Sequence, residues 1–279
     1  MISESCAKCL YDRQQSRNDN KEYLAKVKEL LDNRRAEDTS PYMVYQFNKL
    51  HEELFGKVAD YKDIKKKYND LVLSMEDDLR QEIEASSDPL AKALIFSRIG
   101  NYIDFGAMDH VDQKEFMNLF KDTSMQERDA LVYESFLNAC EGASSFLLIC
   151  DNCGEVVLDK LMLEQLKKRF PNIKVKALVR GKEVLNDATM EDASYAGLGE
   201  VADIVSNGTA VAGTIYDMMP EKARNALDEA DVILAKGQGN YESMSGSGRH
   251  VFYAFLCKCD LFMNRFNVSK LTGMFVEEV

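Results

Sequence analysis

Residues 145–155 read SFLLICDNCGE, an apolar run that is followed at once by an acid, an amide and a glycine. The run over 145–150 is long enough for a buried strand and too short for an ordinary helix. The segment 155–170 then carries apolar residues at helical spacing and ends at Pro171, which cannot continue a helix. A strand, a polar turn and a helix in this order predict the first half of a βαβ unit.

The same alternation of short apolar runs and helical stripes continues downstream. Such alternation is typical of a parallel sheet that helices cover on both faces. We therefore predict an α/β domain over residues 143–279. Its further strands are expected at 173–179, 202–205, 231–235 and 251–257, and its further helices at 192–198 and 221–230.

Upstream of the sheet the sequence predicts helices only. Tyr23 and Val27 fall at helical spacing, and Ser40-Pro41 supplies an N-cap and a first-turn proline for the helix that follows. We therefore predict an all-helical domain over residues 1–142. Further helical stripes cover 64–79, 90–99, 112–120 and 127–140.

Composition limits the class of protein. The 279 residues are 46% hydrophobic and 29% charged, which excludes a disordered chain, and the net charge of −12 makes nucleic acid an unexpected partner. The longest apolar run, 251–257, is too short to cross a membrane, and no signal peptide is expected. The odd number of seven cysteines favours free thiols and a cytoplasmic location.

Polar or flexible residues follow each of the first four predicted strands. Ligands of open parallel sheets bind beyond the carboxyl ends of the strands, so these residues would meet at one edge. Asparagine, aspartate and glycine are also ordinary turn residues, and each position alone has that simpler explanation. The four strand ends carry Asp151-Asn152, Asn186-Asp187, Asn207-Gly208-Thr209 and Lys236-Gly237-Gln238-Gly239-Asn240.

The chemistry of these residues favours a metal and a phosphate ester. Asp151, Asn152 and Asp187 are hard oxygen ligands of the kind that magnesium and manganese prefer. Lys236 and the amides of the glycine turns could hold an anion, and a metal beside them would polarise a phosphoryl oxygen. None of the three histidines follows these strands, which argues against a zinc hydrolase and a Ser-His-Asp site.

Other motifs in the sequence are weaker evidence for a function. The string GLGEVA at 197–202 lies between a predicted helix and a strand, which is the wrong order for a dinucleotide loop, and there is no P-loop. Cys6 and Cys9 form a C-x-x-C pair that could bind a structural zinc or could simply be small buried hydrophobes. Cys150 and Cys153 form a second pair, which straddles the predicted metal ligands.

Five motifs occur in order along nearly the whole chain: C-x-x-C at 6–9, GNYIDFG at 100–106, CDNCGE at 150–155, LNDAT at 185–189 and KGQGNYE at 236–242. Together they resemble the damage-control phosphatase family, long catalogued as domain of unknown function 89, in its stand-alone microbial branch with an N-terminal C-x-x-C. The resemblance implies a three-layer α/β/α sandwich with a mostly parallel sheet, preceded by an all-helical N-terminal domain. It also implies a phosphatase that depends on magnesium, manganese, cobalt or nickel and hydrolyses small phosphorylated metabolites, such as sugar phosphates or phosphopantetheine-like compounds.

The resemblance also assigns residues to roles. The metal would be held by Asp151, Asn152 and Asp187, and Lys236 would act with the first two in catalysis. The substrate pocket would include Asn101, Asp104, Lys236, Asn240 and Glu242, to which the strand-end pattern adds Asn207, Gly208 and Thr209.

Two alternatives stay open at this point. A eukaryotic member of the family has been described as a carboxyl methyltransferase, so an S-adenosylmethionine-dependent methyltransferase is the second hypothesis, although no glycine-rich loop follows the first strand. The third is a non-catalytic module that binds a metal or a metabolite. The sequence leaves the physiological substrate, the native metal and the oligomeric state open.

Overall fold

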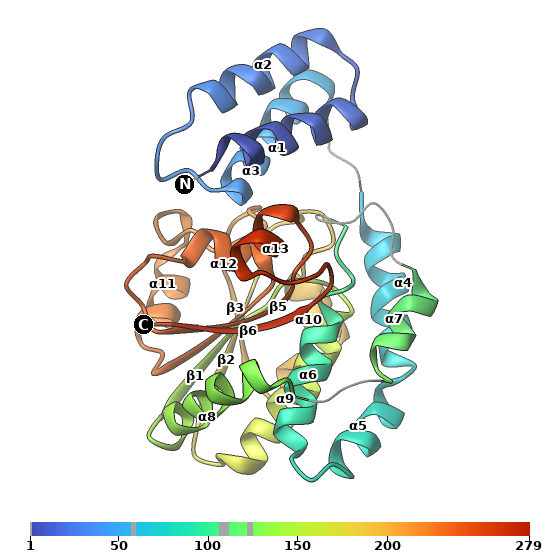
Figure 1. Ribbon diagram of the computed structural model, residues 1–279, viewed down its shortest axis with the longest axis vertical. Coiled ribbons are helices and arrows are strands. Elements are labelled where there is room, and N and C mark those ends of the chain that lie inside the picture. The colour runs from blue at the N-terminus through green and yellow to red at the C-terminus, as the bar shows by residue number, and fades with distance from the viewer. Residues whose placement is uncertain (1, 57–59, 106–111, 122–124) are drawn as a thin grey trace.

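The computed structural model describes residues 2–56, 60–105, 112–121 and 125–279. Its central feature is a sheet with helices packed around it (Figure 1). The sheet has six strands in the order β3-β2-β1-β4-β5-β6. The first five strands run parallel, and β6 pairs antiparallel with β5. The strands are β1 (Ser145–Ile149), β2 (Lys174–Val179), β3 (Asp203–Ser206), β4 (Val232–Lys236), β5 (Val251–Leu256) and β6 (Gly273–Glu278).

Helices cover both faces of the sheet. Alternate side chains of a strand point to opposite faces, so Phe146 and Leu148 of β1 enter one core while Leu147 and Ile149 enter the other. The first core lies under α4 (Lys62–Leu73), α5 (Glu76–Glu84), α6 (Pro89–Gly100), α7 (Gln113–Leu119), α8 (Glu127–Glu141), α9 (Glu155–Arg169) and α10 (Met190–Tyr195). The second lies under α11 (Glu221–Asp228), α12 (Gln238–Met244) and α13 (Asp260–Phe266). The predicted sandwich is confirmed.

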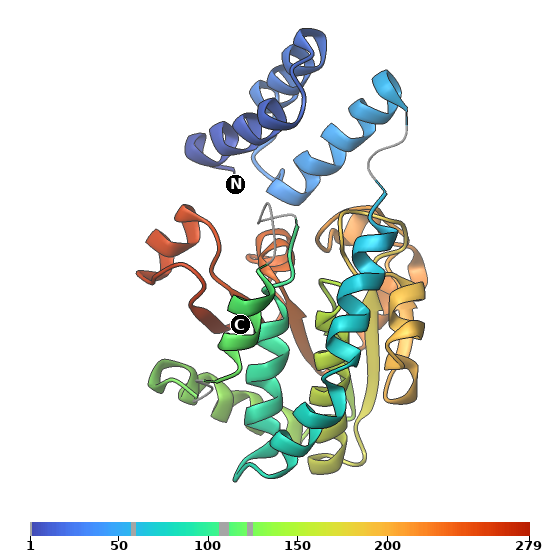
Figure 2. The same cartoon turned by 90° about the vertical axis from the view of Figure 1, so that its right-hand side faces the viewer.

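The first three helices form a separate bundle at one end of the molecule, seen at the top of Figures 1 and 2. Tyr23, Val27 and Phe47 are the centre of a small core of their own. The bundle consists of α1 (Glu4–Arg17), α2 (Lys21–Asp32) and α3 (Ser40–Phe55), and α3 contacts α12 of the sheet domain. α4 to α8 share the core of the sheet rather than that of the bundle. The predicted domain boundary at residue 142 stays a prediction.

Most predicted helices and strands are present with shifted ends. The stripe predicted over 64–79 is two helices that meet at Ser74 and Met75, and Thr39 rather than Ser40 caps α3. The glycine turn expected after β4 is the start of α12, because Gly237 takes the positive φ of +79° and the chain turns into a helix directly after it. Among the α-helices and strands of the described residues, α1, α12, α13 and β6 are not predicted from the sequence.

No helix in the described part of the chain is both long enough and apolar enough to span a membrane.

Candidate functional site

A cavity of about 180 Å³ opens where the carboxyl ends of the central strands face the α1–α3 bundle. Its floor includes Asp151, Asn152 and Asp187, which follow β1 and β2. Residues of α1, α3 and α12 and of the neighbouring loops form the wall. The cavity is lined by Cys6, Cys9, Leu10, Arg13, Ser40, Pro41, Val44, Asp104, Asp151, Asn152, Leu185, Asp187, Ala212, Gln238, Gly239, Glu242 and Cys259.

Backbone pairing between two loops brings the three predicted metal ligands together. Asn152 and Asp187 form an antiparallel bridge, and the backbone N–H of Ala188 donates to the carbonyl oxygen of Asp151 at 2.7 Å. The side-chain Nδ2 of Asn152 donates to Oδ2 of Asp151 at 2.7 Å. The loops after β1 and β2 therefore hold two carboxylates and one amide in a single cluster.

Arg180, which sequence reasoning missed, bridges the two carboxylates. Its Nε donates to Oδ2 of Asp187 at 2.6 Å, and its Nη2 lies 3.3 Å from Oδ1 of Asp151. The side chain is 1% exposed, and Nη1 is fixed by the carbonyl oxygen of Gly213 and by Asn240. Because Arg180 directly follows the apolar run of β2, the same strand-end pattern that identified Asp151 could have identified it.

The cluster carries an excess of negative charge. Burial raises the pKa of Asp151 well above its usual value, and the charges of Asp187, Glu155 and Asp104 raise it further against the effect of Arg180. Burial likewise raises the pKa of Asp187 to about 6, although Arg180 opposes the shift. Glu155 and Asp104 have partner cations in Lys236 and Lys258, which leaves the one guanidinium group of Arg180 against the two carboxyl groups of Asp151 and Asp187.

The donor set fits a hard divalent cation. Carboxylates that burial and mutual repulsion disfavour are stabilised when a cation neutralises them, and magnesium and manganese prefer oxygen donors. In the described residues no group of three His, Cys, Asp or Glu side chains could hold a metal. A site here would therefore use the amide oxygen of Asn152 beside the carboxylates of Asp151 and Asp187.

The helical region contributes Asn101 and Asp104 to the same place. Nδ2 of Asn101, at the end of α6, donates to Oδ2 of Asp151 at 2.9 Å, while its Oδ1 accepts from the backbone N–H of Leu256. Asp104 lines the cavity and pairs with Lys258 at 2.7 Å. Sequence reasoning missed Lys258. Gly106, the last residue of the predicted motif, lies outside the described residues.

Lys236 lies behind the cluster rather than in the cavity wall. In β4 the even-numbered side chains face α6 and α9, so Nζ of Lys236 reaches Glu155 at 2.7 Å, Asp159 at 2.8 Å and the carbonyl oxygen of Ser97 at 3.0 Å. The side chain is fully buried. Its predicted contact with a phosphoryl group stays a prediction, and that contact would have to displace one of these three acceptors.

The predicted anion loop after β3 pairs with the loop after β2 instead. Oδ1 of Asn207 accepts from the backbone N–H groups of Gly181 and Thr209, and a Cβ on Gly208 would meet Pro220. No helix begins at Asn207, Gly208 or Thr209, and none of the three lines the cavity. The structure therefore does not bring this loop to the cavity. The loop joins the loop that follows β2 at Gly181 and Lys182, and the buried Nδ2 of Asn207 has no hydrogen-bond partner among the described residues.

Asn240 and Glu242, both on α12, have different surroundings. Asn240 is fully buried: its Nδ2 donates to the carbonyl oxygens of Cys150 and Lys236, and its Oδ1 accepts from Arg180. It holds strand ends together and does not line the cavity. Glu242 does line it, and burial raises the pKa of its carboxyl group to about 7.

Three of the seven free cysteines face this cavity. Cys6 and Cys9 lie one turn apart on α1, and Cys259 faces them from the start of α13. No zinc-binding group of three His, Cys, Asp or Glu side chains occurs in the described ranges, so zinc at Cys6 and Cys9 stays a prediction. Cys153 and Cys257 are buried in the core.

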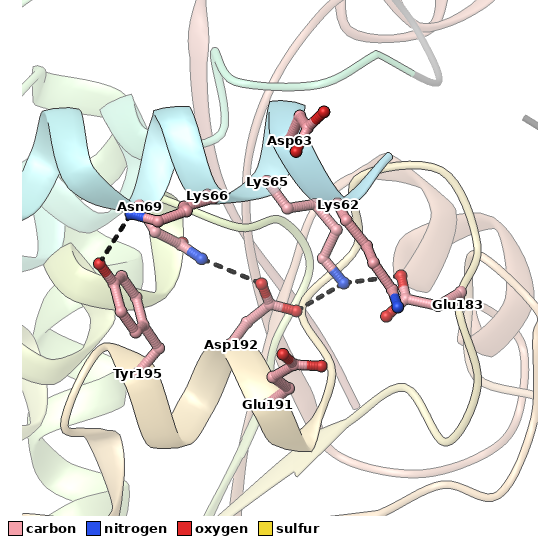
Figure 3. Close-up of a pocket in the computed structure, with 9 residues that line it drawn as sticks. All are labelled: Lys62, Asp63, Lys65, Lys66, Asn69, Glu183, Glu191, Asp192 and Tyr195. Atoms are coloured by element: carbon pink, nitrogen blue, oxygen red, sulfur yellow. Dashed lines mark hydrogen bonds and ion pairs between the residues drawn. The ribbon is translucent and has the colours of Figure 1, made fainter. Parts of the chain in front are cut away.

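A second cavity of about 280 Å³ lies between α4 and α10 (Figure 3). Lys65 pairs there with Asp192 at 2.6 Å and with Glu183 at 2.9 Å. Asn69 donates to Asp192 and accepts from the backbone N–H of Gly154 at 2.6 Å. These contacts connect α4 to the turn that follows Asn152 and to the loop that carries Asp187, so they help to hold the two loops of the first site in place.

Comparison with known proteins identifies relatives over most of the chain. A family model described as a damage-control phosphatase ARMT1-like domain matches residues 1–271. A protein of Archaeoglobus fulgidus named damage-control phosphatase is 31% identical over 237 residues, which are 84% of this chain and 81% of that one. A damage-control phosphatase of Pyrococcus horikoshii is 28% identical over 223 residues, 78% of this chain and 74% of that one. The crystal structure of a DUF89 family protein from P. horikoshii has the same fold, with a TM-score of 0.77, 23% identity and coverage of 99% and 98% of the two chains.

Proposed function

Because the chain belongs to the damage-control phosphatase family with the ARMT1-like domain, we propose that it hydrolyses small phosphorylated metabolites with the help of a divalent metal. Membership of this family supports the phosphatase activity. The single observation that supports the metal is the cluster of Asp151, Asn152 and Asp187 at the strand ends, with more acid than Arg180 neutralises. The free thiols favour a cytoplasmic location, as the sequence predicts.

In this proposal the residues of the cluster share the binding of one cation and one phosphate ester. The carboxylates of Asp151 and Asp187 and the amide oxygen of Asn152 hold the cation, which supplies polarisation of a phosphoryl oxygen when bound. Asn101 and Arg180 keep the carboxylate of Asp151 in place through the contacts described above. In the overall reaction the ester P–O bond breaks, a P–O bond to the oxygen of water forms, and a proton of that water ends on the departing alcohol.

The shape of the cavity supports a small substrate. The phosphate end would lie beside Asp151, and the rest of the molecule would lie against Leu10 and Val44 of the helical bundle. At about 180 Å³ the cavity suits a compact metabolite rather than a polymer. Sugar phosphates and phosphopantetheine-like compounds, the substrates that the family resemblance implies, are the ones that we propose to test first.

Removal of metal is expected to abolish hydrolysis. After dialysis against EDTA, the chain should release no phosphate from p-nitrophenyl phosphate or from a panel of phosphorylated metabolites, because the acidic cluster then has no cation to polarise the ester. Adding back magnesium, manganese, cobalt or nickel should restore turnover with at least one of them. Full activity in the metal-free protein would contradict the proposal, and phosphate release is the measurement.

Gly237→Ala is expected to lower kcat/KM about 10²-fold, since a misplacement of the order of 1 Å at a site can have that effect. A Cβ at Gly237 would lie 2.0 Å from Oδ2 of Asp151, so that carboxylate must move. Gly246→Ala is the matched control, because Gly246 has the same φ of +79° and nothing within 4 Å of an added Cβ. Equal rates in the two variants would show that the displacement of Asp151 does not matter.

The methyltransferase alternative makes a different thermal prediction. A protein is stabilised by whatever binds its folded state, so a methyltransferase would melt at higher temperature with S-adenosylmethionine. The proposed phosphatase should instead melt at higher temperature with manganese and phosphate. A non-catalytic module would show such binding with no turnover of any phosphate ester.

A further inference from the structure

We propose that Glu155 is a positioning residue that orients Asn152 and Asn101 around the cation site. The inference rests on the proposed function, because it concerns the same metal cluster. Glu155 opens α9 and is fully buried, three residues after Asn152. It does not line the cavity, so it acts through its neighbours rather than on substrate.

One oxygen of Glu155 accepts three N–H groups that belong to the site. Oε2 lies 3.2 Å from the backbone nitrogen of Asn152, 3.0 Å from its Nδ2 and 3.2 Å from Nδ2 of Asn101. Nδ2 of Asn152 also donates to Asp151. Both hydrogens of that amide are therefore used, one on each carboxylate.

This arrangement decides which end of the Asn152 amide can meet a cation. An asparagine amide has a donor end and an acceptor end, and only the oxygen can bind a metal. Because Glu155 and Asp151 both require the NH2 end, Oδ1 is the end left for the cation. The same carboxylate holds the NH2 end of Asn101 toward Asp151, while Oδ1 of Asn101 accepts from the backbone N–H of Leu256.

The other oxygen of Glu155 is held from the opposite side. Oε1 accepts from Nζ of Lys236 at 2.7 Å, and Lys236 is fixed in turn by Asp159 and by the carbonyl oxygen of Ser97. At Gly100 an added Cβ would lie 2.9 Å from Cα of Glu155, so α6 approaches this residue closely. Glu155 is thus fixed between the site and the buried lysine, as a group that orients metal ligands must be.

Asp159 provides a matched comparison. It lies one helical turn further along α9, is also fully buried and also pairs with Lys236. Its remaining contact is with the hydroxyl group of Ser97 at 2.6 Å, and it touches none of the predicted metal ligands. Glu155→Gln and Asp159→Asn each remove one buried carboxylate beside the same lysine, but only the first changes what the two asparagines meet.

The test is a titration of the full chain with Mn²⁺, with the free ion measured by electron paramagnetic resonance. Glu155→Gln is expected to weaken Mn²⁺ binding by about 10- to 100-fold, the usual effect of losing an orienting neighbour, because one amide oxygen cannot serve both the asparagines and Lys236. Asp159→Asn is expected to bind Mn²⁺ within about twofold of the wild type, since it leaves every contact of the site intact. Circular dichroism melts of each variant accompany the titrations.

Each outcome decides the matter. Weaker binding in Glu155→Gln alone supports the proposal, whereas equal binding in the two variants overturns it and leaves the proposed phosphatase untouched. A wild-type chain that binds no Mn²⁺ overturns the proposed metal site and this inference together. Should Glu155→Gln not fold, Glu155→Asp decides: it keeps the charge beside Lys236 but withdraws the carboxylate by one methylene, and undiminished Mn²⁺ binding there would overturn the proposal.

Discussion

Asp151→Asn is expected to lower kcat/KM for p-nitrophenyl phosphate at least about 10³-fold, because the metal supplies several kcal/mol of charge stabilisation and each 1.4 kcal/mol is a factor of ten. The substitution removes a carboxylate that Asp187 and Asn152 cannot replace. It keeps the shape of the side chain and one oxygen for Asn101 and Asn152. The chain should therefore still fold, and since burial and nearby acids raise the pKa of Asp151, loss of its charge removes repulsion from the folded state.

The control for this experiment is Asp203→Asn. Asp203 is exposed at the amino end of β3, at the opposite edge of the sheet, so the same chemical change should leave kcat/KM unaltered. Mn²⁺ binding, measured beside the rates, should fall in Asp151→Asn only. Wild-type turnover in Asp151→Asn would show that the reaction takes place elsewhere on the chain.

The parts of the site that could be predicted from the sequence are those that follow from strand order. Asp151, Asn152 and Asp187 were identified because parallel strands deliver their following residues to one edge, and that edge is where the structure gathers them. Asn207 is predicted on the same ground, but it lies in a loop that bonds to the loop after β2 and does not line the cavity. The strand-end pattern locates an edge and does not tell which of its polar residues close a turn.

The strand-end pattern does not tell where the side chains of Glu155 and Lys236 point, and only for Lys236 does another sequence pattern supply the answer. Glu155 looks like an ordinary acid in the first turn of a helix, where it would suit the helix dipole on the surface. Its burial depends on the close approach of α6 at Gly100, a tertiary contact that no local pattern contains. The direction of Lys236 was within reach, because the alternation along β4 places even-numbered residues on the face of α6 and α9.

Local features of the sequence explain why β6 and α12 are not predicted. β6 is an antiparallel edge strand in which Met274 and Phe275 are adjacent and buried, so the sequence shows no clean alternation. At the start of α12, the glycines at 237 and 239 read as a turn, although only Gly237 needs a positive φ. A Cβ at Gly239 would meet the carbonyl oxygen of Ala212, so this glycine lets α12 pack closely against the backbone at Ala212.

Lys236→Met is expected to lower the free energy of unfolding by about 3–5 kcal/mol near neutral pH, the usual effect of removing one partner from a buried ion pair. Lys236, Glu155 and Asp159 are all fully buried, so two carboxylates would be left without their cation. Although burial opposes its charge, Asp159 and Glu155 raise the pKa of Lys236 above its ordinary value, so the lysine is charged at pH 8 and below. Urea unfolding at pH 8, with the wild type beside it, measures the loss.

The pH dependence of this loss distinguishes its cause. Burial raises the pKa of Asp159 to about 6, while Lys236 and the hydroxyl group of Ser97 lower it. In Lys236→Met the larger of these two opposing effects is lost, so the carboxyl group must take up a proton at still higher pH. Burying a protonated carboxyl group costs less free energy than burying a carboxylate. The difference in the free energy of unfolding from the wild type should therefore be largest at pH 8 and should shrink toward pH 5. Adding Asp159→Asn to Lys236→Met removes one of the two unpaired charges and should recover part of the stability at pH 8. A loss that is the same at both pH values would mean that Lys236 stabilises the chain through packing and not through its charge.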